Sequence, residues 1–176
     1  VFKNLEQDKP KNHFTVGIYD DITNTSLDFS EQYDAAPEGT ISCKFYGLGS
    51  DGTVGANKNS IKIIGDHTDM YAQGYFFYDS KKSGGITVSH LRFGKTPIQS
   101  PYLIDAADFV ACHNPSYMIK GYKIVNDVKP GGKFLLNCQW TPEEVEHHLP
   151  AEAKKYMAEN DIQFYIVNAI DKAREI

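Results

Sequence analysis

The order of apolar and polar positions along the chain predicts strands that alternate with helices. Residues 40–48, TISCKFYGL, form a β-rich run, and a glycine-rich loop then leads into residues 53–64, whose apolar positions are close to helical spacing. Residues 70–79 and 85–93 are predicted as a second buried strand and a third strand. Strict alternation in the third strand would place Ile86, Val88 and His90 on one face.

The second half of the chain continues the same alternation. Three further strands are predicted at residues 107–113, at 131–138 after a KPGG turn, and at 161–168 as a last buried strand. Helices are predicted in the segments between and after these strands, at residues 114–126, 140–150, 150–160 and 169–176. Thr141, Pro142 and Glu144 have the spacing of a capping box at a helix start.

Strands that alternate with helices and read as continuous apolar runs indicate an α/β fold. We expect a mainly parallel, Rossmann-like sheet with helices on both faces. Residues 1–39 differ: 13–19 read as a strand, and the rest is rich in polar residues, so we expect an irregular N-terminal arm or linker from a preceding domain. The second domain would then be 40–176. The chain starts without methionine and ends in a helical pattern, so we expect both ends to be excised and this domain to be truncated at its C-terminus.

Composition narrows the classes of function. The 176 residues are 41% hydrophobic and carry 18 basic against 23 acidic side chains, a net charge of −5, which argues against a nucleic-acid partner. No apolar run approaches the roughly 20 residues of a membrane span, so no membrane partner is expected. The three widely spaced cysteines, Cys43, Cys112 and Cys138, are predicted to be buried thiols, which fits a cytoplasmic location.

The glycine-rich loop is the main candidate for chemistry. Gly47, Gly49 and Gly52 match G-x-G-x-x-G between a strand and a helix, where backbone N–H groups and the helix dipole can face a phosphate. Asp79 ends the next strand and is followed by Ser80, Lys81, Lys82 and Ser83, which could hold a second phosphate. The pattern therefore fits NADP or coenzyme A. It also fits a tight turn followed by a solvated polar turn.

Three segments carry a resemblance to a known family. Residues 39–68, 83–104 and 107–118 resemble the middle, gamma-type domain of pyruvate:ferredoxin (flavodoxin) oxidoreductase, and the similarity extends from about Lys11 to the C-terminus. The resemblance implies a domain of a large, homodimeric enzyme of anaerobic metabolism that converts pyruvate to acetyl-CoA with ferredoxin or flavodoxin as acceptor. It places thiamine diphosphate, Mg and the 4Fe-4S clusters on other domains of the same polypeptide, and it predicts that the isolated chain is inactive.

The resemblance also assigns a ligand to the loop, the phosphorylated ADP part of coenzyme A. The residues that it implies are Gly49, Ser50, Asp51, Gly52, Thr53, Val54, Gly55, Lys58, Lys81, Lys82 and Ser83. No residue of the chain is predicted to be catalytic or to bind a metal. Two other functions stay open on the residues alone: a self-contained NADP-dependent oxidoreductase, and a non-catalytic interaction domain.

Other conspicuous side chains have competing interpretations. His147 and His148 are adjacent on a predicted helix and point in different directions, so a solvated face is favoured over a shared metal. His90 and Arg92 could line the crevice at the carboxyl edge of the sheet or face partner domains. Asn114 is either a helix cap, which we favour, or a crevice residue.

Overall fold

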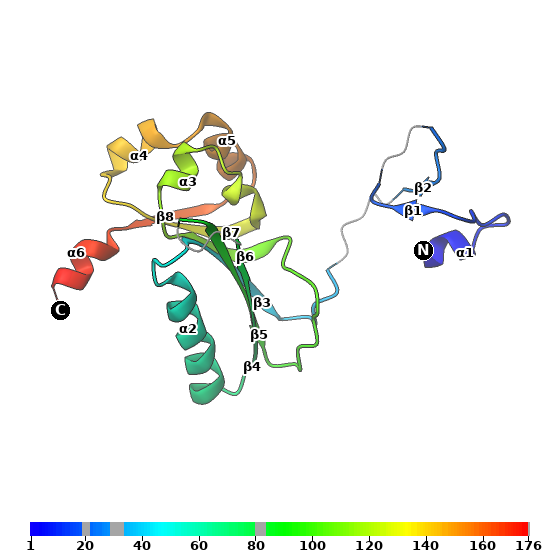
Figure 1. The fold of residues 1–176 in the computed structure, drawn as a ribbon, viewed down its shortest axis with the longest axis horizontal. Helices are drawn as coiled ribbons and strands as arrows, with labels where there is room; N and C mark the ends of the chain where they lie inside the picture. Colours follow the sequence, from blue (N-terminus) through cyan, green and yellow to red (C-terminus); the bar gives the residue numbers. More distant parts are fainter. Residues whose placement is uncertain (19–21, 29–33, 80–83, 176) are drawn as a thin grey trace. The chain divides into compact units, whose positions relative to one another are not determined.

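The computed structural model describes residues 1–18, 22–28, 34–79 and 84–175, and it divides the chain into two compact units (Figure 1). The first unit is Val1–Ala35 and the second is Ala36–Ile176. Each unit is described by itself.

The first unit is small and is held by polar contacts. It contains helix α1 (Phe2–Leu5) and two short parallel strands, β1 (Thr15–Val16) and β2 (Ser26–Leu27). The buried Asn4 amide accepts a hydrogen bond from the Lys11 N–H at 3.0 Å and donates one to the Lys11 carbonyl at 3.1 Å. The strand predicted at 13–19 therefore exists only as a two-residue element, and its last residue lies outside the described part of the chain.

The second unit is built on a mostly parallel six-stranded sheet in the order β4-β5-β3-β6-β7-β8. The strands are β3 (Ile41–Leu48), β4 (Tyr71–Tyr78), β5 (Ile86–Gly94), β6 (Ala107–Cys112), β7 (Val128–Asn137) and β8 (Gln163–Val167). Four adjacent strands, β3-β6-β7-β8, run parallel to one another, whereas β5 is antiparallel to both β3 and β4. The predicted α/β class and mainly parallel sheet are confirmed, with β5 as a reversal that the strand pattern did not reveal.

Helices cover both faces of the sheet, as predicted. The elements are α2 (Thr53–His67), α3 (Ser116–Ile119), the 3₁₀ turn η1 (Ile124–Asp127), α4 (Pro142–His148), α5 (Ala151–Glu159) and α6 (Ala169–Arg174). Right-handed crossovers that leave the centre in opposite directions place their helices on opposite faces. Accordingly, α2 packs on β3, β4 and β5, whereas η1 contacts β6 and β7, and Figure 1 shows α3, α4 and α5 on that other side.

The hydrophobic core lies between the sheet and the layer of α3, α4 and α5. Val110, Phe134 and Leu136 of the parallel strands are fully buried there, and the Phe134 and Phe164 rings stack with centroids 5.7 Å apart. Burial of each such side chain contributes about 1.5–3 kcal/mol to folding. Helix α4 begins with the predicted capping box, in which Thr141 Oγ1 accepts from the Glu144 N–H and Glu144 accepts from the Thr141 N–H.

Three predicted features of the strands are wrong. Strand β4 is not buried: it pairs only with β5, and most of its side chains are exposed. The KPGG segment is not a turn before β7 but an irregularity within it, because Ala107 pairs with Val128 and Phe109 with Lys133. The extra residues of β7 form a bulge in its pairing with β6. The bulge includes Gly131, whose φ is 75° and whose N–H donates to the Asn160 carbonyl. Strand β8 is also only half-buried, as an edge strand.

Candidate functional site

The loop between β3 and α2 lies where open α/β sheets bind ligands. The chain leaves β3 toward β4 on one side of the sheet, and it leaves the neighbouring strand β6 toward β7 on the other. Loops that diverge from adjacent carboxyl ends in this way leave a crevice between them. The loop at residues 49–52 follows β3, and residues 113–115 follow β6, so both segments lie at this divergence of the strands.

Two glycines determine the local shape of the loop. A Cβ on Gly47 would lie 2.3 Å from Thr53 Oγ1, so the bare Cα of Gly47 allows α2 to start directly against β3. Gly52 precedes the helix with φ 87°, a conformation that costs side chains with a Cβ about 1–2 kcal/mol. Ser50 adopts a left-handed conformation too, with φ 74°, so the loop holds one strained non-glycine residue.

The Asp51 carboxylate binds the loop's own backbone. One oxygen accepts from the Leu48 N–H and the other from the Thr53 N–H, each at 2.8 Å. A negative charge is favoured at this end of a helix because the first N–H groups have no partner inside the helix. Val54 and Gly55 carry the next two of these N–H groups. An incoming phosphate would therefore meet two such N–H groups and one carboxylate already in place.

His113 is a site residue that the sequence analysis missed. Its Nδ1 lies 2.9 Å from Thr53 Oγ1, and it therefore joins the end of β6 to the start of α2. Its backbone N–H donates to the Tyr46 carbonyl, and its carbonyl accepts from the Asn137 amide. Burial lowers the pKa of His113, while the Asp51 carboxylate acts in the opposite direction. Its position directly after an apolar strand next to β3 is the one signal that could have identified it.

The structure gathers only part of the predicted site. Residues 49–55 lie together at the start of α2, but Lys58 Nζ lies 5.5 Å from the centre of the Phe76 ring of β4. Lys81, Lys82 and Ser83 lie outside the described residues. Asn114 lies one residue before Pro115, the N-cap of α3, so the favoured capping position is off by one residue, although the Asn114 side-chain oxygen accepts from the Ser116 N–H at 3.0 Å.

His90 and Arg92 lie away from the loop. In the antiparallel register of β5, His90 is opposite Lys44 in the middle of β3, and Arg92 is opposite Ser42 near the beginning of β3. The His90 Nδ1 accepts from the Ile104 N–H at 3.2 Å. Burial, followed by the nearby Lys44 and Arg92 charges, lowers the pKa of His90 to about 4, although Asp127 opposes the shift. The sheet's carboxyl edge is therefore not lined by these two residues.

A buried ion pair lies on the same face as His90. Lys44 Nζ is 2.6 Å from Asp127 Oδ2, and the Tyr46 hydroxyl also donates to this carboxylate. Burial and then the hydrogen bond to Asp127 raise the pKa of Tyr46 above its usual range. The pair attaches η1 to β3. The sequence offered no signal for it, since a lysine in an apolar strand pattern is read as solvent-facing.

The cysteines and histidines show no metal-binding arrangement in the described part of the chain. Cys43, Cys112 and Cys138 are buried free thiols, and burial raises the pKa of Cys43 and of Cys112 to about 12. No group of three or more His, Cys, Asp or Glu residues there could hold a metal ion. The His148 ring stacks on Trp140 with centroids 4.3 Å apart. Among the described residues, no helix is long and apolar enough to cross a membrane.

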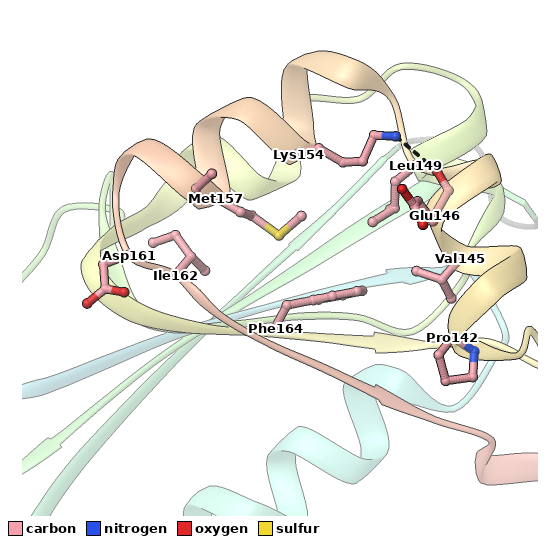
Figure 2. Close-up of a pocket in the computed structure, with 10 residues that line it drawn as sticks. Pro142, Val145, Glu146, Leu149, Lys154, Met157, Asp161, Ile162 and Phe164 are labelled. Carbon is pink, nitrogen blue, oxygen red and sulfur yellow. Dashed lines mark hydrogen bonds between the residues drawn. The ribbon is translucent and has the colours of Figure 1, made fainter.

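A separate pocket lies under α4 and α5, beside β8 (Figure 2). Its volume is about 440 Å³, and apolar side chains, including Val145, Met157 and Phe164, form most of its lining. The Lys154 ammonium at its rim donates to the Glu146 carbonyl at 3.0 Å. Its lining residues come from elements that do not contribute to the loop.

Comparison with known proteins assigns the chain to a family. The model of the family "Pyruvate ferredoxin/flavodoxin oxidoreductase" matches residues 42–176. The chain is 64% identical over its whole length to pyruvate:ferredoxin oxidoreductase of Moorella thermoacetica, and 60% identical to pyruvate-flavodoxin oxidoreductase of Enterobacter agglomerans. It spans 15% of the length of each of these relatives. The fold therefore defines an α/β domain of the kind found in 2-oxoacid oxidoreductases.

A solved structure supports the fold. A 2-oxoglutarate:ferredoxin oxidoreductase from Magnetococcus marinus, with 2-oxoglutarate, coenzyme A and succinyl-CoA bound, matches with a TM-score of 0.54 at 14% identity. The match covers 79% of this chain and 22% of that one. The match of the family model to residues 42–176 shows that the chain belongs to the pyruvate ferredoxin/flavodoxin oxidoreductase family.

Proposed function

We propose that the chain is a domain of a pyruvate:ferredoxin or pyruvate:flavodoxin oxidoreductase and binds the phosphorylated ADP part of coenzyme A at the loop of residues 49–55. The reaction of the whole enzyme would convert pyruvate, coenzyme A and oxidised acceptor to acetyl-CoA, carbon dioxide and reduced acceptor. The observation that carries the proposal is the family match over residues 42–176, which includes this loop at the divergence of β3 and β6.

The loop offers two backbone N–H groups to a diphosphate, next to the Asp51 carboxylate, which accepts from the Leu48 and Thr53 N–H groups. The N–H groups of Val54 and Gly55 start α2, and the positive end of the helix dipole adds to their attraction for an anion. Lys58, one turn later, is within the same helix, although its ammonium lies over Phe76. The 3′-phosphate of coenzyme A would lie near Lys81, Lys82 and Ser83, which follow the end of β4.

The remaining cofactors are proposed for other parts of the same polypeptide. The three cysteines are buried free thiols, and burial raises the pKa of each, so they do not fit as thiolate ligands of a 4Fe-4S cluster. Thiamine diphosphate and Mg would bind outside these 176 residues, as would ferredoxin or flavodoxin. The whole enzyme is proposed to be a cytoplasmic homodimer, and the 176-residue chain alone to be inactive.

Calorimetric titration with coenzyme A, dephospho-coenzyme A and NADP tests the ligand. Replacing Lys81 and Lys82 together with alanine removes charge at one end of the ligand, worth about 1–3 kcal/mol if both lysines bind a phosphate. Coenzyme A should then bind roughly 5- to 150-fold more weakly, while dephospho-coenzyme A should change little. Equal losses for both ligands would show that the lysines do not read the 3′-phosphate.

A glycine pair separates loss of the site from loss of folding. Gly52 and Gly121 both have positive φ, at 87° and 76°, and a Cβ on either would meet open space. Gly52→Val and Gly121→Val should therefore destabilise the fold by similar amounts, about 1–2 kcal/mol each. Only Gly52→Val should abolish binding of all three adenine ligands. Equal binding by the two variants would place the ligand elsewhere.

A further inference from the structure

Strand β4 presents a row of exposed aromatic side chains at the edge of the sheet. Its eight residues, Tyr71–Tyr78, include no charged residue and no proline. Gly74 and Phe76 face α2, since a Cβ on Gly74 would lie 3.9 Å from Ile61 and the Lys58 ammonium lies over the Phe76 ring. Side chains alternate along a strand, so Tyr71, Tyr75 and Phe77 point to the opposite face. Their exposed fractions are 52%, 56% and 45%.

The exposed row continues onto the segment before β6. The buried Arg92 guanidinium lies 3.5 Å from the Gln73 amide oxygen of β4, and it donates to the Tyr102 carbonyl at 2.9 Å. The guanidinium also stacks on the Tyr102 ring at 4.7 Å. Tyr102 and the adjacent Leu103 are 39% and 47% exposed. These five side chains, Tyr71, Tyr75, Phe77, Tyr102 and Leu103, are called the aromatic face of β4.

Within the part of the chain that the structure describes, β4 lacks the features that keep an open edge strand from associating. Edge strands are normally protected by lysines, prolines, bulges or a covering element. Strand β4 pairs with β5 in continuous register over all eight residues, without a bulge, and it has no charged side chain of its own. Several exposed aromatic side chains beside such an edge favour an interface at this strand.

The length of the relatives indicates what covers this face. Two relatives match all of this chain at 60% identity or more, yet the chain is 15% of their length. A segment of such a polypeptide that covers the aromatic face of β4 is present once in every molecule, so the face is never left exposed for want of a partner. We propose that the aromatic face of β4 packs against another segment of the same polypeptide, outside residues 1–176. That segment presents an uncharged surface with hydrogen-bonding groups for the hydroxyls of Tyr71 and Tyr75. This inference rests on the proposed function in one respect: it requires that the chain is part of a longer polypeptide.

Photo-cross-linking in the full-length polypeptide tests the proposal. p-Benzoylphenylalanine replaces Tyr75 in one variant and Phe77 in a second. A third variant carries it at Lys155 as a control, because the Lys155 side chain is 74% exposed and ion-paired with Glu159. After irradiation, peptide mass spectrometry should find cross-links from positions 75 and 77 to residues outside 1–176 of the same chain. The Lys155 control should give at least ten times fewer.

Three results would overturn the proposal. Cross-linked species of twice the chain mass would assign the face to a second copy. Cross-links confined to residues 1–35 would assign it to the N-terminal unit. If neither position 75 nor position 77 gave cross-links, or if the Lys155 control gave equal yields, the aromatic face of β4 would be ordinary surface. None of these readouts depends on coenzyme A, so failure of the ligand titration and failure of this proposal are distinguishable.

Discussion

At the scale of single residues, Gly47 links the sequence motif to helix packing. Gly47 is the first glycine of the G-x-G-x-x-G match, and it approaches Thr53, whose side chain fills the space where a Cβ would lie. Its role is the close contact between helix and strand. Gly55 differs, because a Cβ there would meet nothing within 4 Å.

This difference predicts opposite effects of the same substitution. Gly47→Ala should destabilise the fold by about 1–3 kcal/mol, because Thr53 is buried and cannot move aside without shifting α2. Gly55→Ala, the matched control, should be neutral or stabilise by up to about 1 kcal/mol, because alanine is a better helix former. Urea unfolding of both variants measures the two changes. Equal stability of the two variants would contradict the proposed packing role.

His90 predicts how stability depends on pH. Its pKa is about 4 in the folded protein and about 6.5 in an unfolded chain, so between these values the unfolded state binds more protons. The free energy of unfolding should therefore fall as the pH drops from about 6.5 to 4, by up to about 1.4 kcal/mol per pH unit. Denaturant unfolding across this range tests the slope. His90→Gln should reduce it, leaving the smaller contribution of His113, whose pKa is also lowered.

Which residues of the site could be predicted depends on how local their signals are. The glycine spacing is a local pattern, and it predicted a loop between a strand and a helix, which the structure has between β3 and α2. The resemblance implies Lys58 as a contact, but its ammonium lies over the aromatic ring of Phe76, eighteen residues later. His113 contacts Thr53 across sixty positions of sequence, and only the pairing of β3 with β6 brings them together.

At the scale of elements, the sequence pattern predicts where the strands and helices lie better than it predicts which strands are neighbours in the sheet. The boundaries of β3 and α2 agree closely with the predicted segments. The pattern of β4 was interpreted as buried because its aromatic residues are apolar, yet strand order places β4 at the edge. The antiparallel β5 follows from the short connection after β4, which has too few residues for a parallel crossover.

The contact between η1 and β3 gives a prediction at this scale. Asp127→Ala should lower the free energy of unfolding by about 3–5 kcal/mol. The Lys44 side chain is 9% exposed, and its ammonium would be left buried without a counter-charge. Lys44→Met should cost less, since it removes the buried charge and leaves Asp127 partly in water. Once Lys44 is methionine, the further change Asp127→Ala should have a smaller effect, about 1–3 kcal/mol, because the hydrogen bond from the Tyr46 hydroxyl is still lost but no buried charge is left unpaired. A double-mutant cycle by chemical denaturation measures the coupling. Independent, additive losses would show that the pair does not anchor η1.

At the scale of the whole molecule, the two units differ in what holds them together. The main hydrophobic core is made of side chains between Ile104 and Met157, with partly buried neighbours from β3, β5 and β8. No residue of Val1–Ala35 belongs to this core as the structure describes it. The first unit relies on hydrogen bonds such as those between Asn4 and Lys11. The second unit thus contains the interactions that folding requires.

A chain that begins at Ala36 should therefore fold without the first unit. Its thermal midpoint should lie within about 3 °C of that of the 176-residue chain, a shift that roughly 1 kcal/mol produces in a domain of this size. A chain that begins at Gly49 is the control, because it lacks β3, the strand between β5 and β6, and it should not fold cooperatively. Circular dichroism during heating reports both results. If the chain from Ala36 melted far below the full chain, residues 1–35 would be part of the folding unit and the domain boundary predicted near residue 40 would be wrong.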